Sequence, residues 1–275
     1  MGRPNTPAAF RCLLLLLIIT AAASLHAANL SREQRISEGL AAGAITGDPV
    51  WLEAGSARFL AIHMASFAAV RQGGAILLHD SGAHADWHEV IHPLRRHLAE
   101  RGWDTLSLQL PLGDNPSDPS DSASLLTLSG PRIKAGIDFL KGRQVEAVAL
   151  IGHGLGAAMA MDFIAAQGAG IGALVAVGVA PGGRGEEDPL ARLLGGSDVP
   201  ILDLYGSLDL PAVVDSARER RALAARNGRD RYRQERVSGA DHYFSGMQEE
   251  LNNRIAAWLR QAVRQPTPAR RPSTP

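Results

Sequence analysis

A glycine-rich turn follows an apolar segment near the middle of the chain, with the spacing used to hold a catalytic nucleophile. Residues 145–156 read V-E-A-V-A-L-I-G-H-G-L-G. The last five, Gly152-His153-Gly154-Leu155-Gly156, match the frame glycine-x-serine-x-glycine, in which a sharp strand-to-helix turn raises a serine above a sheet. Gly154 stands at the serine position. The spacing therefore predicts a nucleophile elbow whose nucleophile position is vacant.

An acid and a histidine follow this turn in the order of a catalytic triad. Asp209 and His242 each come directly after a predicted strand, and in α/β-hydrolases the nucleophile, the acid and the histidine occur in that chain order. His242 would act as the general base, while Asp209 would fix its tautomer and stabilise the imidazolium. Alone, each residue fits an ordinary loop position. Together, at two expected strand ends, they favour the remnant of a triad.

The backbone donors of an oxyanion hole do not depend on a serine. We expect one from the amide of Leu155 and another from the loop after the third strand, near Asp80 or Ser81. Ser81 could itself face the cleft as a nucleophile, although a serine there is more often a turn residue. His79 and His153 adjoin the same cleft, and His153 is expected to point away from it or to pack beside it.

Other functions of these motifs are less well supported. A glycine-rich turn can bind the phosphates of a dinucleotide, but no acidic residue ends a strand about 20 residues later, where one would hold the ribose. His88 and His92 share a face at helical spacing, without the acidic partner of a metalloprotease motif. A cleft site of His79, His153 and His242 is conceivable, but the sequence does not fix their distances. We therefore predict no metal ligands and no cofactor.

The composition is that of one large globular domain. The chain has 275 residues, and its 28 basic residues equal its 28 acidic residues. This balance gives no reason to expect nucleic acid as a partner.

The N-terminal segment predicts export. Arg3 and Arg11 precede an apolar run, residues 12–23, that is shorter than the roughly 20 residues needed to span a bilayer. Cleavage after small residues near Ala28 would remove Cys12, the only cysteine, so a thiol nucleophile and disulfides are excluded from the mature protein. We divide the chain into a signal peptide (1–28), an α/β-hydrolase-like domain (29–263) and a disordered Pro/Arg-rich tail (264–275), with the mature protein in the periplasm and no membrane span.

Apolar strands alternate with helical patterns along the domain, which is typical of a mostly parallel sheet covered on both faces by helices. The predicted elements are helices at Ser31–Ala42, Trp87–Arg101, Gly130–Leu140, Val213–Asn227 and Met247–Val263, with a further helix starting at Ala157, and strands at 50–52, 58–64, 75–79, 105–110, 145–152, 173–179, 200–205 and 232–237. Pro111 to Ser124 is predicted as a loop, and Gly182 to Asp198 as a small polar insertion that is either a lid or a loop.

Several segments resemble an uncharacterised, exported α/β-hydrolase-like family of proteobacteria. They are A-R-F-L-A-I-H, I-L-L-H-D-S-G-A-H-A-D-W with V-I-H-P-L-R after it, G-W-D-T-L-S-L-Q-L-P and G-H-G-L-G-A. The resemblance covers about Leu30 to Leu259 and is most specific between Ile76 and Pro111. It implies one α/β-hydrolase fold in the periplasm and no settled activity. The family pattern expects glycine after the strand-end histidine, where this chain has Asp80.

Two functions follow from these residues. The first is a non-catalytic or weakly catalytic protein. It would bind an acyl- or carbonyl-bearing ligand, or a periplasmic partner protein, in the cleft beside the nucleophile elbow. The second is an ester or amide hydrolase that uses His242 and Asp209 with Ser81 or an activated water. The vacant position at Gly154 favours the first, and the retained acid and histidine favour the second.

Overall fold

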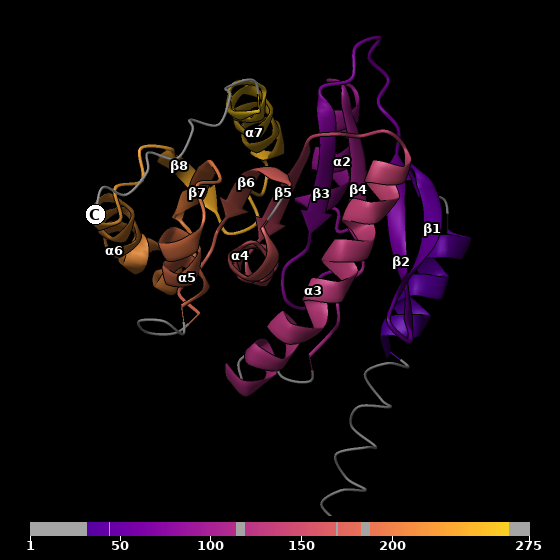
Figure 1. Ribbon diagram of the computed structural model, residues 1–275, viewed down its shortest axis with the longest axis horizontal. Coiled ribbons are helices and arrows are strands. Elements are labelled where there is room, and N and C mark those ends of the chain that lie inside the picture. Colours follow the sequence, from indigo (N-terminus) through magenta and orange to yellow (C-terminus); the bar gives the residue numbers. More distant parts are fainter. Residues whose placement is uncertain (1–31, 44, 114–118, 169, 183–187, 264–275) are drawn as a thin grey trace, which may run out of the picture.

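Short apolar strands form a central eight-stranded sheet in the computed structural model, which describes residues 32–43, 45–113, 119–168, 170–182 and 188–263 (Figure 1). The strands are β1 (Asp48–Ala54), β2 (Ala57–Met64), β3 (Gly73–Leu78), β4 (Trp103–Leu108), β5 (Val148–His153), β6 (Ile171–Val177), β7 (Ile201–Leu208) and β8 (Tyr232–Asp241). The helices are α2 (Ile91–Ala99), α3 (Pro119–Gly142), α4 (Leu155–Gln167), α5 (Pro189–Gly196), α6 (Pro211–Arg226) and α7 (Gln248–Ala262), preceded by helical residues 32–42.

The strand order is β1-β2-β4-β3-β5-β6-β7-β8. All neighbours from β4 to β8 are parallel, whereas β2 pairs antiparallel with both β1 and β4. Because the strands from β3 onward run the same way, their carboxyl ends meet at one edge of the sheet. The predicted α/β-hydrolase fold, with a mostly parallel sheet, is confirmed.

Alternate residues of each central strand face opposite layers of helices. In β3, Ile76 and Leu78 pack in the cluster that contains residues of α3, α4 and α5, whereas Ala75 and Leu77 pack in the cluster that contains residues of α2 and α7. Figure 1 shows α3, α4 and α5 in front of the sheet and α2 and α7 behind it. Both faces of β3 are buried, which explains why its sequence is a continuous apolar run.

Two helix boundaries differ from the prediction. The helix α3 begins at Pro119, inside the segment predicted as a loop, and continues through Pro131, one residue after the predicted start at Gly130. Proline is favoured in the first turn of a helix and disfavoured in its interior, so Pro131 gives no sequence signal that the helix extends back to Pro119. Burial of Leu125 and Ile133 in the same core extends the helix across that proline.

The helix α2 begins at Ile91 rather than Trp87, because turns occupy residues 88–90. The exposed His88 lies before the helix, and His92 bonds the carboxylate of Asp86 through Nδ1 at 2.9 Å. The predicted shared helical face of His88 and His92 is therefore wrong.

The segment predicted as a polar insertion contains a core helix. Asp188 caps α5 by accepting a hydrogen bond from the Leu190 amide, and Leu190, Leu193 and Leu194 are buried in the cluster that includes α4. These leucines recur at helical spacing, but the glycines and charges around them obscure the pattern in sequence. A lid role for α5 is excluded by this packing, while residues 183–187 lie outside the described part.

Smaller differences concern strand ends and termini. β6 ends at Val177 because Gly178 turns with a φ of +58°, and β8 continues to Asp241, four residues beyond its predicted end. Ser31 and the predicted segments 1–28 and 264–275 lie outside the described residues. Within the described residues, no helix combines the length and apolarity needed to cross a membrane.

The burial of α5 predicts that Leu193→Ala destabilises the fold. The side chain is fully buried, so its truncation should lower the free energy of unfolding by about 2–5 kcal/mol. Urea unfolding followed by circular dichroism measures this change. Leu128→Ala, at a position that is 49% exposed, is the control and should cost much less. A negligible effect of Leu193→Ala would mean that α5 is a detachable lid.

Candidate functional site

The turn between β5 and α4 has the geometry of a nucleophile elbow. Gly154 links the two elements with φ +51° and ψ −117°, a conformation that side-chain-bearing residues rarely adopt. A Cβ on Gly152 would lie 2.4 Å from the Ala157 backbone, and one on Gly156 would lie 2.4 Å from the carbonyl oxygen of Leu78. Strand and helix thus approach too closely for any residue but glycine at these two positions.

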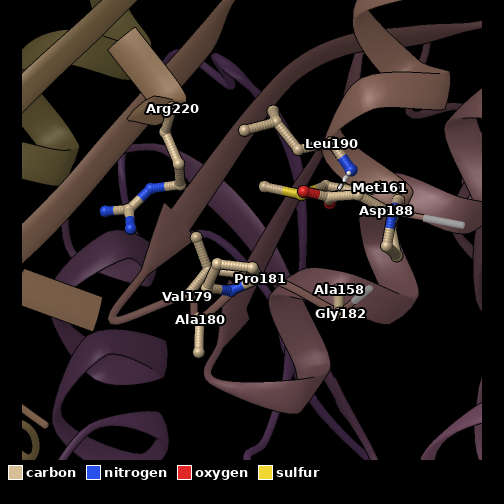
Figure 2. Close-up of a pocket in the computed structure, with 10 residues that line it drawn as sticks. Ala158, Met161, Val179, Ala180, Pro181, Gly182, Asp188, Leu190 and Arg220 are labelled. Atoms are coloured by element: carbon tan, nitrogen blue, oxygen red, sulfur yellow. Dashed lines mark hydrogen bonds between the residues drawn. The ribbon is translucent and has the colours of Figure 1, made fainter. Parts of the chain in front are cut away.

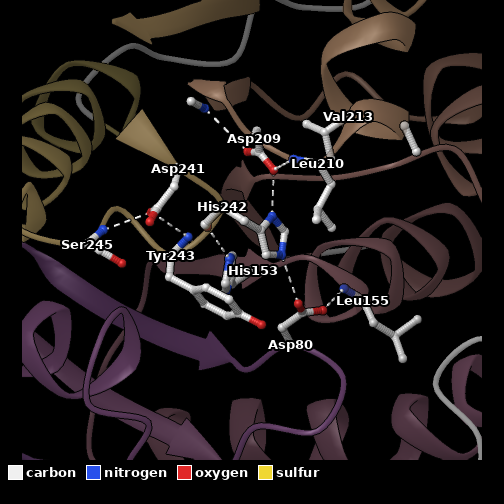
Figure 3. Close-up of polar contacts among 12 residues, drawn as sticks. Asp80, His153, Leu155, Asp209, Leu210, Val213, Asp241, His242, Tyr243 and Ser245 are labelled. Atoms are coloured by element: carbon white, nitrogen blue, oxygen red, sulfur yellow. Dashed lines mark hydrogen bonds and ion pairs between the residues drawn. The ribbon is translucent and has the colours of Figure 1, made fainter. Parts of the chain in front are cut away.

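An acid–histidine pair lies at the same edge of the sheet. Nδ1 of His242, which follows β8, is 2.6 Å from Oδ1 of Asp209, which follows β7 (Figure 3). The amides of Leu210 and Gly206 also donate to this carboxylate, at 2.7 and 3.3 Å. Gly178 leaves room for the pair, because a Cβ there would lie 2.9 Å from Nδ1 of His242. The structure therefore brings together the acid and histidine that the sequence pointed to.

Asp80 fills the space in front of the elbow. The register pairs Leu78 of β3 with Gly152 of β5, so the residues two positions further on, Asp80 and Gly154, face each other. A Cβ on Gly154 would lie 2.0 Å from Oδ1 of Asp80. The carboxylate of Asp80 thus takes the space that a side chain at the nucleophile position would need.

The same carboxylate also bonds the general base and the oxyanion-hole amide that a nucleophile at this position would need. Its Oδ2 lies 3.0 Å from Nε2 of His242, and its Oδ1 accepts a hydrogen bond from the Leu155 amide at 2.7 Å (Figure 3). The sequence placed Leu155 as an oxyanion donor, and the structure directs that donor to the protein's own anion. The sequence predicted only a backbone donor near Asp80 or Ser81 in this loop. The signal that could have revealed its role is the pairing of Gly154 with an acid where the family pattern expects glycine.

Charges in the site stabilise one another. Burial lowers the pKa of His242, but its hydrogen bonds to Asp209 and Asp80 and their charges outweigh burial and raise the pKa to about 9. Burial raises the pKa of Asp80, and this is outweighed by the bond to His242, the nearby His153 and the amides of Leu155 and Ser81, so the pKa of Asp80 is lowered. At neutral pH, an imidazolium therefore lies between two carboxylates.

His153 is buried beside His242, as expected for a histidine that packs next to the cleft. Its Nε2 lies 2.9 Å from the backbone oxygen of His242, and the two imidazole rings are 4.6 Å apart between centroids. Burial lowers the pKa of His153. A carbonyl oxygen only accepts, so Nε2 carries the proton of this bond.

His79 supports the loop and is not free to act in the cleft. Its Nε2 accepts from the Leu110 amide at 3.0 Å, so its Nδ1 donates to the carbonyl oxygen of Asp80 at 2.8 Å. Burial lowers the pKa of His79 to about 4, which keeps it neutral. Both ring nitrogens are used, and this contradicts the conceivable metal site of His79, His153 and His242.

Ser81 lies in the turn after Asp80 and is partly exposed. Within the described residues, no hydrogen bond joins its hydroxyl to an imidazole, and Nε2 of His242 bonds Asp80 instead. The geometry gives Ser81 no base.

Two small hollows adjoin this edge of the sheet. One has room for about one water-sized molecule, lies beside the ion pair and is lined by Asp80, Ser81 and Leu155 with apolar side chains such as Leu110 and Met159. The other is a shallow depression between α4, α5 and the segment after β6 (Figure 2). His242, His153 and Asp209 line neither hollow. Of the cluster of Asp80 and these three residues, only Asp80 borders the first hollow.

The strand order, the elbow and the acid–histidine pair define an α/β-hydrolase-fold protein. Within this class, the chain belongs to the family described as "Protein of unknown function (DUF3530)", whose model matches residues 19–130 and 128–261. A comparison with curated proteins finds no match.

Solved structures share the fold at low sequence identity. Est1E from Butyrivibrio proteoclasticus has a TM-score of 0.63 at 14% identity, over 80% of this chain and 100% of that one. An alpha-beta serine hydrolase homologue from Coxiella burnetii has a TM-score of 0.61 at 17% identity, over 79% and 100%. XC6422 from Xanthomonas campestris, described as an a/b serine hydrolase without lid, has a TM-score of 0.59 at 14% identity, over 83% and 100%. This likeness concerns the fold.

The raised pKa of His242 predicts a pH-dependent stability. A folded-state pKa of about 9 against 6.5 means that the stabilisation is complete below pH 6.5 and is lost as pH rises through 9. The shift of about 2.5 pH units corresponds to about 3 kcal/mol. Urea unfolding in chelator-treated buffer should show a decrease of this order between pH 6.5 and 9.

His242→Gln should remove this decrease, and the exposed His88→Gln should retain it. A wild-type protein whose stability does not change over this range would mean that His242 is not held as an imidazolium.

Proposed function

We propose that this protein is a ligand- or partner-binding member of the α/β-hydrolase fold that does not hydrolyse esters through a covalent serine intermediate. The observation that carries the proposal is the position of the Asp80 carboxylate. It occupies the space in front of Gly154, bonds Nε2 of His242 and takes the amide of Leu155. Nucleophilic acyl transfer needs all three of these for the substrate and the attacking group.

The alternative is hydrolysis by a water activated by His242. A general base must reach the proton it abstracts with a free lone pair. Nε2 of His242 already faces Asp80 and Nδ1 faces Asp209, so neither nitrogen offers one. This supports binding over catalysis.

Features around the cleft support an apolar ligand or partner surface. Leu208 and Leu210, on either side of Asp209, are 69% and 51% exposed, and Tyr243, next to His242, is 36% exposed. The hollow beside Asp80 also has several apolar side chains in its wall, but it has room for only about one water-sized molecule, so a larger ligand would contact the exposed side chains at its rim. A ligand carbonyl would have to displace Asp80 from the Leu155 amide, so the exposed apolar surface is the better-supported contact for an acyl ligand or a partner.

The paired change Asp80→Gly with Gly154→Ser tests the proposal. The double variant frees the space, the amide and the histidine at once, and should hydrolyse p-nitrophenyl esters at least roughly a thousandfold faster than the wild type, since a triad serine is worth on the order of a millionfold. Gly154→Ser alone should stay inactive, because its Cβ would clash with Asp80.

Adding His242→Ala to the double variant is the control and should abolish the gain. Hydrolysis by the wild-type protein that disappears in His242→Ala would instead establish an active enzyme and overturn the proposal.

We infer that the protein is exported to the periplasm. Support comes from the N-terminal residues alone, with Arg3 and Arg11 ahead of the apolar run 12–23. Expression of the full chain in a Gram-negative host should give a periplasmic protein whose intact mass corresponds to a start near Asn29. Recovery of the full-length mass from the cytoplasm would contradict export.

A further inference from the structure

Three side chains that can ligate a metal converge in front of the elbow. We propose that Asp80, His153 and His242 form a binding site for one divalent transition-metal ion, with Zn²⁺ the best fit. One ligand atom from each residue lies within 4.8 Å of those of the other two. The three residues come from the ends of β3, β5 and β8, so the sheet itself sets their spacing.

Each imidazole has one nitrogen already fixed by an outer acceptor. Nδ1 of His242 bonds the carboxylate of Asp209 at 2.6 Å, which leaves Nε2 facing Asp80. Nε2 of His153 bonds the backbone oxygen of His242 at 2.9 Å, and its Nδ1 has no hydrogen bond among the described residues. Metal-bound histidines characteristically donate their second nitrogen to a carboxylate or a backbone carbonyl, which orients the ring. Both outer contacts are present here.

The ligand set favours zinc over the hard cations. Two imidazoles and one carboxylate with an open position are a common zinc set, whereas Mg²⁺ and Ca²⁺ prefer oxygen ligands. Bonds of about 2.0–2.1 Å place tetrahedral ligand atoms about 3.3 Å apart. Asp80 and His242 are already at 3.0 Å. The widest separation, at most 4.8 Å, has to close by no more than about 1.5 Å, the difference between 4.8 and 3.3.

Nε2 of His242 becomes available to a metal only when it loses the proton that it shares with Asp80. A metal at this point would replace the proton shared by Nε2 of His242 and Oδ2 of Asp80, while Oδ1 of Asp80 stays on the Leu155 amide. The open coordination position of the metal would face the adjoining hollow, which is lined by Asp80 and Leu155. Gly154 contributes by having no side chain in this space.

This inference deepens the binding role proposed above by naming the ligand as a metal ion, and rests on it only in treating the cleft as a ligand site. It also revises the expectation from the sequence that no residues ligate a metal. That expectation considered His79 in the set, whereas the structure replaces His79 with Asp80.

The test is zinc binding by the untagged mature protein, measured by competition with a chromophoric chelator. The wild type should bind one equivalent of Zn²⁺. Asp80→Asn and His153→Gln, which keep the side-chain shape, should each weaken binding at least about a hundredfold, and Asp209→Asn about 10–100-fold. His88→Gln, at an exposed position outside the cluster, is the matched control and should bind as the wild type does. Circular dichroism checks that each variant is folded.

X-ray absorption of the zinc-loaded wild type needs no variant and should show two imidazoles with oxygen ligands. Absence of stoichiometric binding, a spectrum without two imidazoles, or binding unchanged by Asp80→Asn and His153→Gln would overturn the metal site. Ester hydrolysis is measured separately on the metal-free protein. Activity there would overturn the non-hydrolytic role and leave the metal site standing, so the two failures are distinguishable.

Discussion

The carboxylate of Asp80 connects three parts of the chain that are distant in sequence. It lies after β3, bonds the amide at the start of α4, 75 residues away, and bonds His242, 162 residues away. A buried anion needs such partners, because an uncompensated charge in the interior is strongly unfavourable. Its position therefore depends on the whole sheet edge, and the state of the elbow, the histidine and the amide donor depends on it in turn.

Gly154 and Asp80 are physically one feature. A side chain at the elbow and a carboxylate after β3 would occupy the same volume, since an added Cβ would lie 2.0 Å from Oδ1. The vacancy at the elbow is therefore filled from the neighbouring strand. A serine hydroxyl alone would therefore not restore a catalytic site, because Asp80 already bonds the imidazole of His242 and the amide of Leu155.

The arrangement keeps the scaffold of nucleophilic catalysis and changes its charge. Where a neutral hydroxyl and an empty amide donor would be needed, the site holds an imidazolium between two carboxylates. Such a cluster fits the cation site proposed above, in which the metal ion replaces the shared proton. The exposed apolar side chains of Leu208, Leu210 and Tyr243 add a surface at the same edge that a ligand or a partner can contact.

The sequence by itself determined the strands of the sheet, the elbow glycines and the presence of an acid and a histidine at two strand ends. These are local signals, because burial on both faces requires continuous apolar runs and close strand–helix contact requires glycine. The sequence did not predict that helices begin at Pro119 and Ile91, because tertiary packing outweighed the local composition at these boundaries. Only the tertiary structure decided what Asp80 does. The register that sets Leu78 beside Gly152 is a contact between distant segments, and a one-dimensional pattern does not reveal which side chain fills a space left by another.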